Sequence, residues 1–183
     1  ALVHVVTSEE ASVRIRFSID EVGPFETSLT PVGTEHDLVV VGMRALSTYS
    51  FELIAMQESE ETTGPIVDFT TGELPLIHPF EVVKHQPSLV EDGITFLGMS
   101  SADKDPDPNV ALYIAVDQDG EVVWYYNDVF AEHRFADREV RPMPDGTLML
   151  SMRGNYRFID LAGNVVGGLQ GGPSVGGPLH HDA

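Results

Sequence analysis

The sequence has no cysteine, few basic residues and no long apolar run. Without cysteine the chain forms neither disulfide bonds nor thiolate metal sites, although the cellular compartment stays open. Lysine and arginine number 10 against 29 acidic residues, so the formal net charge is −19. A surface this acidic repels the phosphates of nucleic acids and anionic lipids, so we expect neither as a partner. No run of about 18 apolar residues exists, so no segment is predicted to insert into a membrane.

The start of the sequence lacks the charged segment, apolar run and small-residue cleavage site of a signal peptide. It opens instead on Leu2–Val6, an apolar stretch typical of a strand. We therefore expect that any signal peptide has been removed or was never present. Hydrophobic residues make up 42% of the 183 residues, which predicts a globular chain of one or two domains.

Helical periodicity is missing as well, and short alternating stretches take its place. Val13, Ile15 and Phe17 alternate with polar residues, which predicts a strand with one buried face. Gly23–Pro24 is predicted as a turn and Glu58–Thr63 as an acidic loop. Strands at this spacing predict an all-β sandwich over residues 1–72.

Leu46-Ser-Thr-Tyr49, followed by a strand and then by Val67-Asp-Phe-Thr-Thr-Gly72, resembles a fibronectin type III or immunoglobulin-like domain. The Leu-x-x-Tyr piece looks like the tyrosine corner of that fold, which implies that the phenol of Tyr49 bonds to nearby backbone. The usual tryptophan of an early strand is missing here. Such modules usually space or bind rather than catalyse. Three prolines in residues 73–92 then predict a semi-rigid connector.

Residues 93–183 contain an internal repeat. Asp117–Val123 is echoed by Asp160–Val166, at an offset of 160 − 117 = 43 residues. Asp119–Gly120 and Asp145–Gly146 predict two-residue hairpin turns between short strands, and Ala162–Gly163 is a weaker signal of the same kind. A period of about 40 residues with such hairpins is typical of β-propeller blades. We therefore predict an incomplete β-propeller of about one blade plus pieces.

His180 and His181 are the strongest candidates for chemistry, because they follow the predicted glycine-rich loop 167–178 and precede Asp182. Histidine can act as nucleophile, general acid or metal ligand near neutral pH. Adjacent residues on a strand point to opposite faces, so at most one would face a shared site. No second ligand cluster is visible, so no metal site is predicted.

Arg153 is the basic residue that we single out as a candidate anion contact. It lies just past a predicted strand and beside Gly154, from where a guanidinium group could reach a central cavity. The other arginines of this region are interpreted as partners of nearby acids: Arg134, Arg138, Arg141 and Arg157. The remaining histidines are expected to be exposed or packed: His4, His36, His78, His85 and His133.

The acidic loop 103–109 has oxygen-bearing side chains at alternate positions, a spacing that calcium favours. Pro108, however, stands where a calcium-binding EF-hand loop needs glycine, and no glutamate follows at the twelfth position. The pattern therefore favours a solvated turn over a calcium site.

Residues 110–183 as a whole resemble the bacterial aryl-sulfate sulfotransferases. The similarity is carried by Ile114-Ala-Val-Asp-Gln-Asp-Gly-Glu-Val-Val-Trp124, Met143-Pro-Asp-Gly-Thr-Leu-Met-Leu150 and His180-His-Asp-Ala183. The resemblance implies a β-sandwich followed by a six-bladed propeller, in a secreted or periplasmic enzyme that needs no PAPS cofactor. It also implies ping-pong transfer of a sulfuryl group from an aryl sulfate to a phenol. His180 or His181 would then be the catalytic histidine and Arg153 a substrate contact.

A six-bladed ring at this period needs roughly 250 residues, more than this chain has after its connector. We therefore expect an N-terminal portion, inactive by itself, or a chain completed by further blades in trans or by homo-oligomer formation. One alternative is a secreted, non-catalytic β-rich binding or assembly module. A third reading is a propeller that binds carbohydrate or a metal.

Overall fold

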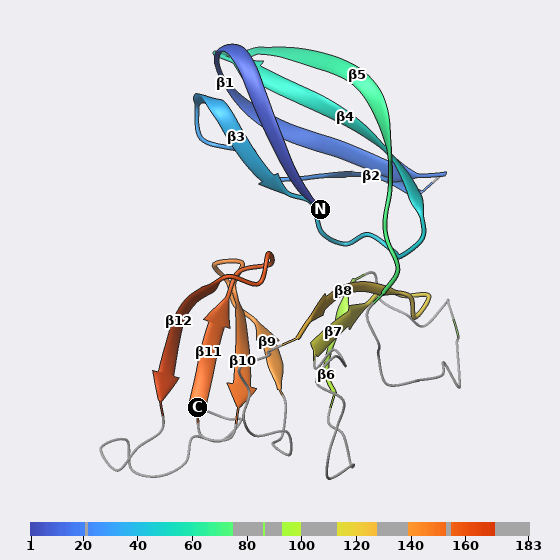
Figure 1. The fold of residues 1–183 in the computed structure, drawn as a ribbon, viewed down its shortest axis with the longest axis vertical. Coiled ribbons are helices and arrows are strands. Elements are labelled where there is room, and N and C mark those ends of the chain that lie inside the picture. The colour runs from blue at the N-terminus through green and yellow to red at the C-terminus, as the bar shows by residue number, and fades with distance from the viewer. Residues whose placement is uncertain are drawn as a thin grey trace. The chain divides into compact units, whose positions relative to one another are not determined.

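The computed structural model describes residues 1–20, 22–74, 86, 93–99, 113–127, 139–152 and 155–170. These residues form strands, turns and irregular segments without a helix, which confirms the predicted all-β class. Accordingly, a helix fit to cross a membrane is not found among them. The chain divides into two compact units, Ala1–Glu73 and Leu74–Ala183 (Figure 1).

The first unit is a curled antiparallel sheet built on one long strand, β1 (Leu2–Ile19). The other strands are β2 (Val22–Glu26), β3 (Gly33–Val39), β4 (Thr48–Gln57) and β5 (Glu60–Thr70). The first half of β1 pairs with β3, and the second half pairs with β2 on one side and β4 on the other. β5 pairs with β4 and forms an edge.

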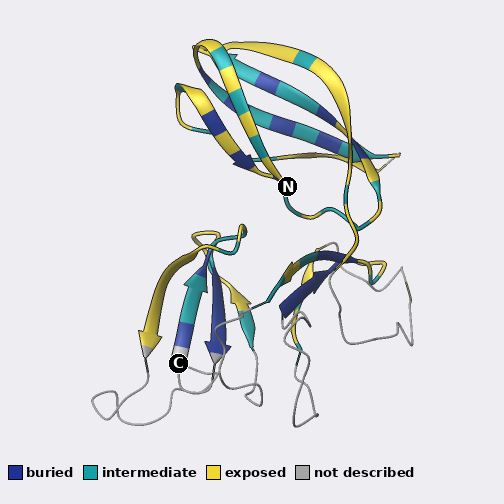
Figure 2. Cartoon of the chain, viewed as in Figure 1, coloured by how far each residue is buried: buried dark blue, intermediate teal, exposed yellow. Residues whose placement is uncertain are grey.

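The core of the first unit lies where the alternating pattern predicts it. Its buried members are Val13, Ile15, Phe17, Leu38, Val40, Tyr49 and Phe51 (Figure 2). The arginines between the apolar positions of β1 lie on the opposite face. Arg16, for example, donates from Nε to Glu26 at 2.9 Å and from Nη1 to Glu52 at 3.0 Å. The alternation therefore sorts apolar from charged side chains, as expected for a half-buried strand.

Two threonines continue the hydrogen bonding of β1 beyond the end of β2. Thr27 N–H donates to the Ile15 carbonyl at 2.9 Å, and its Oγ1 accepts the Ile15 N–H at 3.0 Å. Thr30 makes the same pair of bonds with Val13, at 2.9 and 3.0 Å. Thr30 Oγ1 also lies 2.9 Å from Nδ1 of the buried His36. The hydroxyl groups thus satisfy backbone groups of a buried strand that β2 no longer reaches.

The predicted tyrosine–backbone bond is present. Tyr49 is 2% exposed, and its Oη accepts the backbone N–H of Arg44 at 2.9 Å. The residue between them, Leu46, has a φ of 50°, in the left-handed region that lets a chain turn sharply. The phenol therefore fixes the connection that leads into β4.

Two predicted connections in this unit are wrong. The turn expected at Gly23–Pro24 lies inside β2, because the chain reverses earlier, where Ile19 pairs with Val22. The acidic loop expected at Glu58–Thr63 is mostly strand, since Gln57 pairs directly with Glu60. Carboxylates are tolerated there because β5 is an edge strand whose side chains stay in water.

The second unit contains two antiparallel sheets. The three-stranded sheet has the order β6 (Thr95–Gly98), β7 (Tyr113–Val116) and β8 (Val122–Tyr126). The four-stranded sheet consists of β9 (Val140–Pro142), β10 (Leu148–Met152), β11 (Asn155–Ile159) and β12 (Val165–Gln170), with neighbours in chain order. The three predicted hairpins, β7–β8, β9–β10 and β11–β12, are all present.

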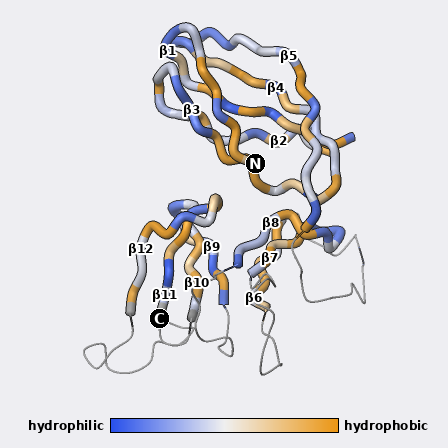
Figure 3. Tube along the Cα trace, in the orientation of Figure 1, coloured by the Kyte–Doolittle hydropathy of each residue, from blue (hydrophilic) through white to orange (hydrophobic). Residues whose placement is uncertain are grey.

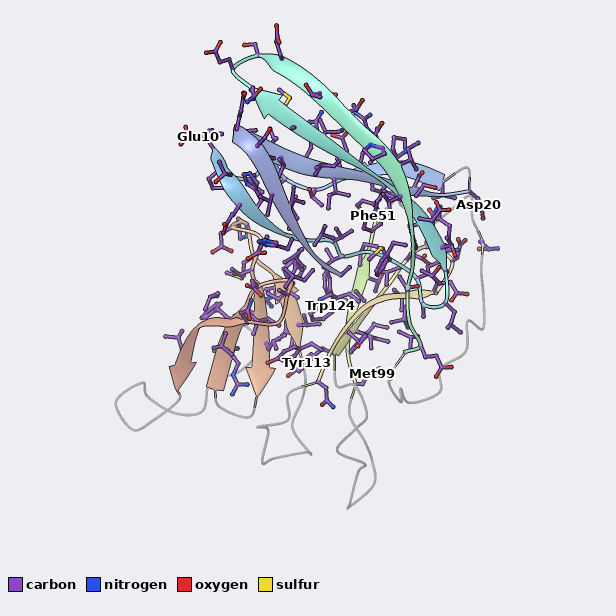
Figure 4. The ribbon with its side chains drawn as sticks, turned by 45° about the horizontal axis from the view of Figure 1, so that its top comes forward. Glu10, Asp20, Phe51, Met99, Tyr113 and Trp124 are labelled. Carbon is purple, nitrogen blue, oxygen red and sulfur yellow. The ribbon has the colours of Figure 1, made fainter. Side chains whose placement is uncertain are left out.

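The two sheets pack on each other through a shared apolar cluster. Its buried members are Tyr113, Leu148, Leu150 and Ile159, with Phe96, Trp124, Tyr126, Val140 and Leu161 around them. Two hydrogen bonds join the sheets across this cluster. Tyr113 Oη donates to the Ser151 carbonyl at 3.0 Å, and Trp124 Nε1 donates to the Leu161 carbonyl at 2.9 Å. Figure 4 labels the two donor residues, Tyr113 and Trp124.

The hairpin loops have three residues rather than the two that the Asp–Gly pairs predict. In the first, Asp117 N–H donates to Glu121 O and Gly120 N–H donates to Asp117 O, both at 3.0 Å. The loops Met143–Thr147 and Asp160–Asn164 repeat this pattern. In each loop only the glycine has a positive φ, between 83° and 88°. A two-residue type I′ loop needs two such residues in succession, whereas a type I turn with a glycine bulge needs one.

The first part of the loop predicted at 167–178 is strand, because β12 extends to Gln170, and residues 171–178 lie outside the described residues. Gly167 pairs with Phe158 and Gly168 with Arg157. The glycines suit this strand because a Cβ on Gly168 would lie 3.1 Å from the Tyr156 carbonyl oxygen. A close approach of neighbouring backbone therefore explains glycine within a strand.

Candidate functional site

One end of the four-stranded sheet collects several segments that carry candidate residues. Asn155 of β11 pairs with Met152, the last residue of β10, and with Gln170, the last residue of β12. Neighbouring strands lie about 4.8 Å apart, so the backbones at Met152 and Gln170 are about 10 Å apart. Glu139 lies at the same end, because its carbonyl accepts the Ser151 N–H at 2.9 Å.

Three segments outside the described residues join the sheet at this end: residues 128–138, 153–154 and 171–183. The predicted site residues Arg153, His180 and His181 belong to them. The described strands therefore bring the attachment points of the two candidate segments together. The contacts of the three side chains are not described, so their role in an anion site stays a prediction.

The described ionic group at this end is an arginine–glutamate pair. Arg141 Nη2 donates to Glu139 Oε1 at 2.8 Å, as predicted for an arginine paired with a nearby acid. The second oxygen, Glu139 Oε2, is buried and has no hydrogen-bond partner in the described part of the chain. A buried carboxylate oxygen favours a cation or a hydrogen-bond donor beside it.

The opposite end of the four-stranded sheet holds two of the three loops, and their aspartates are turn residues as predicted. Asp145 Oδ1 accepts the N–H and the hydroxyl of Thr147, at 3.0 and 2.7 Å. These bonds lower the pKa of Asp145. Asp160 accepts the N–H and the side-chain amide of Asn164, at 2.8 and 2.9 Å. Partial burial raises the pKa of Asp160, but the bonds from Asn164, together with backbone bonds from Ala162 and Gly163, outweigh it and the net pKa is lowered. Both carboxylates are thereby held ionised, and their hydrogen bonds stabilise the turns in which they lie.

The structure extends the repeat to a pair of tyrosines that the sequence reading missed. Tyr113 begins β7 and Tyr156 lies in β11, at an offset of 156 − 113 = 43 residues. They are 0% and 4% exposed. The repeated unit is therefore Tyr-x-x-(Val/Ile)-Asp-x-x-Gly-x-Val-Val. The identical tyrosines at the repeat offset were a signal that the sequence alone could have offered.

Histidines in the described ranges behave as ordinary exposed or packed residues. His4 is exposed and lies 2.8 Å from Asp37, whereas His36 is buried between Thr30 and the Gly33 carbonyl. Across the described strands and turns, histidine, aspartate and glutamate form no group of three that could hold a metal ion. The other candidates lie outside the described residues: the calcium loop 103–109, His78, His85, His133, Arg134 and Arg138.

Comparison with protein-family models finds no matching family. A search of curated proteins finds no significant match.

Proposed function

We propose that the chain is the N-terminal portion of a secreted or periplasmic aryl-sulfate sulfotransferase-like enzyme. Its first unit would be a fibronectin III-like sandwich and its second unit the first blades of a propeller. The observation that carries the proposal is the shared sheet end where β10 and β12 finish. The segments with Arg153 and with His180 and His181 join the sheet there.

The arrangement of the second unit supports the propeller part of the proposal. The four-stranded sheet follows chain order from β9 to β12, as the sheet of a propeller blade does. It packs on a second sheet through an apolar cluster, in the manner of neighbouring blades. The two sheets also share the repeated tyrosine, aspartate and glycine positions. A ring built this way would place β9 innermost and β12 outermost.

The chemistry assigned to this end is nucleophilic transfer of a sulfuryl group. An imidazole nitrogen of His180 or His181 attacks the sulfur of the aryl sulfate, so an S–N bond forms. The S–O bond to the aryl group breaks, and the phenolate leaves and takes up a proton. The oxygen of an acceptor phenol then attacks the sulfur and forms a new S–O bond while the phenol proton passes to solvent. The S–N bond breaks, which frees the imidazole. Arg153 would hold the sulfate oxygens through paired N–H groups, which matters in a chain with a net charge of −19.

The test uses the full-length natural protein with 4-nitrophenyl sulfate as donor and phenol as acceptor. Replacing the nucleophilic histidine, by His180→Ala or His181→Ala, should lower kcat on the order of 10³-fold or more. Arg153→Ala should raise KM more than Arg153→Lys does, because lysine keeps the positive charge and loses only the paired N–H donors of the guanidinium group. His4→Ala, at an exposed site of the first unit, is the matched control and should leave turnover unchanged. No turnover by the unmodified protein would contradict the proposal.

A second candidate function, a non-catalytic binding or assembly module, is favoured by exposed apolar residues on edge strands. Val22 and Phe25 of the edge strand β2 are 56% and 45% exposed. Exposed edges of this kind recruit other strands. Stable assembly of the natural protein together with a complete lack of aryl sulfate turnover would favour this candidate.

A further inference from the structure

Within the described part of the chain, β12 is a sheet edge without the usual protection against pairing. Among the described strands it pairs with β11 alone. Its sequence, Val165-Val-Gly-Gly-Leu-Gln170, has neither a charged residue nor proline. Val165, Val166 and Leu169 are 59%, 57% and 56% exposed, and Figures 2 and 3 show this exposure and hydropathy. Proteins normally protect such edges with charges, proline or a covering segment.

The internal repeat shows that these positions can be covered. Val122 and Val123 of β8 occupy the same repeat positions as Val165 and Val166, since 165 − 122 = 43. The first pair is 6% and 8% exposed, whereas the second pair stands in solvent. The same two valine positions are thus buried in the three-stranded sheet and exposed to solvent in the four-stranded sheet.

The charge around β12 differs from that of the whole chain. Residues 139–170 contain three acids (Glu139, Asp145, Asp160) and three arginines (Arg141, Arg153, Arg157), so this segment has no net charge. The chain as a whole carries −19. The edge strand β5, by contrast, carries Glu60, Glu61 and Asp68. Charges farther away than about 8 Å are largely screened at physiological salt, so repulsion between two copies is weakest at β12.

We infer that β12 is the contact through which two copies of this chain form a homodimer. The two β12 strands pair antiparallel about a two-fold axis near Gly167–Gly168, which joins two four-stranded sheets into one. An antiparallel strand edge is self-complementary, because each copy offers the same alternating N–H and C=O groups. β12 itself contains no acidic residue, so the paired strands place no carboxylates opposite each other. The pairing uses the outer edge of the sheet and is independent of the proposed sulfuryl transfer.

The interface is one short strand from each copy, so the expected affinity is micromolar rather than nanomolar. Sedimentation velocity of the 183-residue chain over a hundredfold range of concentration should show conversion of monomer to dimer. Added salt should strengthen the dimer, because it screens the repulsion between two acidic chains.

Val166→Lys should shift the dimerisation midpoint at least tenfold upward in concentration. About this axis position 166 of each copy lies opposite position 169 of the other, so the substitution places a lysine against an apolar side chain twice in each dimer. Ile66→Lys is the matched control, since Ile66 is 67% exposed on the edge strand β5 and should leave the midpoint unchanged. Fluorescence of the single tryptophan, Trp124, checks that the second unit of each variant is folded. Hydrogen exchange of the unmodified chain gives an independent test, in which the β12 amides should gain protection as concentration rises.

A chain that stays monomeric at every concentration overturns the inference. So does an equal shift with Ile66→Lys, or concentration-dependent protection that appears in β5 and not in β12, because either would place the contact elsewhere. Growth into higher oligomers in place of a dimer would contradict the closed two-fold pairing.

Discussion

The hydrogen bond from Tyr113 to Ser151 tests how the two sheets of the second unit are joined. Ser151 directs its N–H toward Glu139, on the β9 side of β10. The N–H and C=O of one strand residue point the same way, so the Ser151 carbonyl also faces the β9 side. The hydroxyl of Tyr113 donates to it there at 3.0 Å. Tyr113→Phe removes this donor and keeps the ring.

The expected cost follows from the burial of both partners. Tyr113 is 0% exposed and Ser151 is 9% exposed, so water does not readily replace the hydroxyl. A lost neutral hydrogen bond costs about 1 kcal/mol, and a buried carbonyl left without a partner costs about 1–3 kcal/mol. The free energy of unfolding of the second unit should therefore fall by about 1–3 kcal/mol.

Urea unfolding followed by the fluorescence of Trp124 measures this change, because the only tryptophan lies in the second unit. The matched control is Tyr125→Phe in the same sheet, where the side chain is 46% exposed. The control should change the free energy by less than about 0.5 kcal/mol. Equal effects of the two substitutions would refute the described contact between the sheets.

Three further predictions concern turns and buried polar groups. Gly163→Ala should destabilise the second unit more than Gly146→Ala. Both glycines have a φ near 85°, but a Cβ on Gly163 would lie 3.3 Å from the ring of Tyr126, whereas a Cβ on Gly146 would meet no other atom nearby. Urea unfolding measures the loss of stability in both variants. Thr30→Val should lower the free energy of unfolding of the first unit by about 2–4 kcal/mol, because the Val13 N–H and the His36 ring each lose a hydrogen-bond partner. Thr48→Val is the control and should lower it little, because Thr48 bonds to Thr70 at an exposed site. Chemical unfolding followed by far-UV circular dichroism measures both changes. Asp160→Asn should make the free energy of unfolding of the second unit fall less steeply as the pH is lowered into the acid range. The folded pKa lies below the unfolded one, so the contribution is present above the unfolded pKa of about 3.9 and is lost as pH falls through the folded pKa.

Each of these predictions has an outcome that contradicts it. Equal losses for the two glycine variants would mean that the ring does not crowd Gly163. A neutral Thr30→Val would mean that water or another group reaches the Val13 N–H and His36. Unchanged acid sensitivity in Asp160→Asn would mean that the turn does not hold its carboxylate ionised.

The sequence predicts the elements whose residues obey a simple period. Alternation in Val13, Ile15 and Phe17 places the core of the first unit, and the repeat of Asp117 and Asp160 places the hairpins. It fails at Glu60–Thr63, because an edge strand needs no apolar face and therefore leaves no pattern. It also misjudges the loop length, because Asp–Gly suits a two-residue turn and a glycine bulge almost equally well.

The candidate site is only partly readable from sequence. Residue type and spacing single out Arg153, His180 and His181. That their segments join the sheet at one end depends on which strands pair, and Asn155 provides this by pairing with both Met152 and Gln170. Strand order is a tertiary property, so no local pattern reveals it.

The proposed transfer is tested most directly by mass spectrometry of the full-length natural protein after reaction with an aryl sulfate and without acceptor. We predict one added SO₃ on the peptide that contains His180 and His181, lost again when phenol is supplied. No adduct and no released phenol, or an adduct confined to a histidine such as His4, would contradict the assignment.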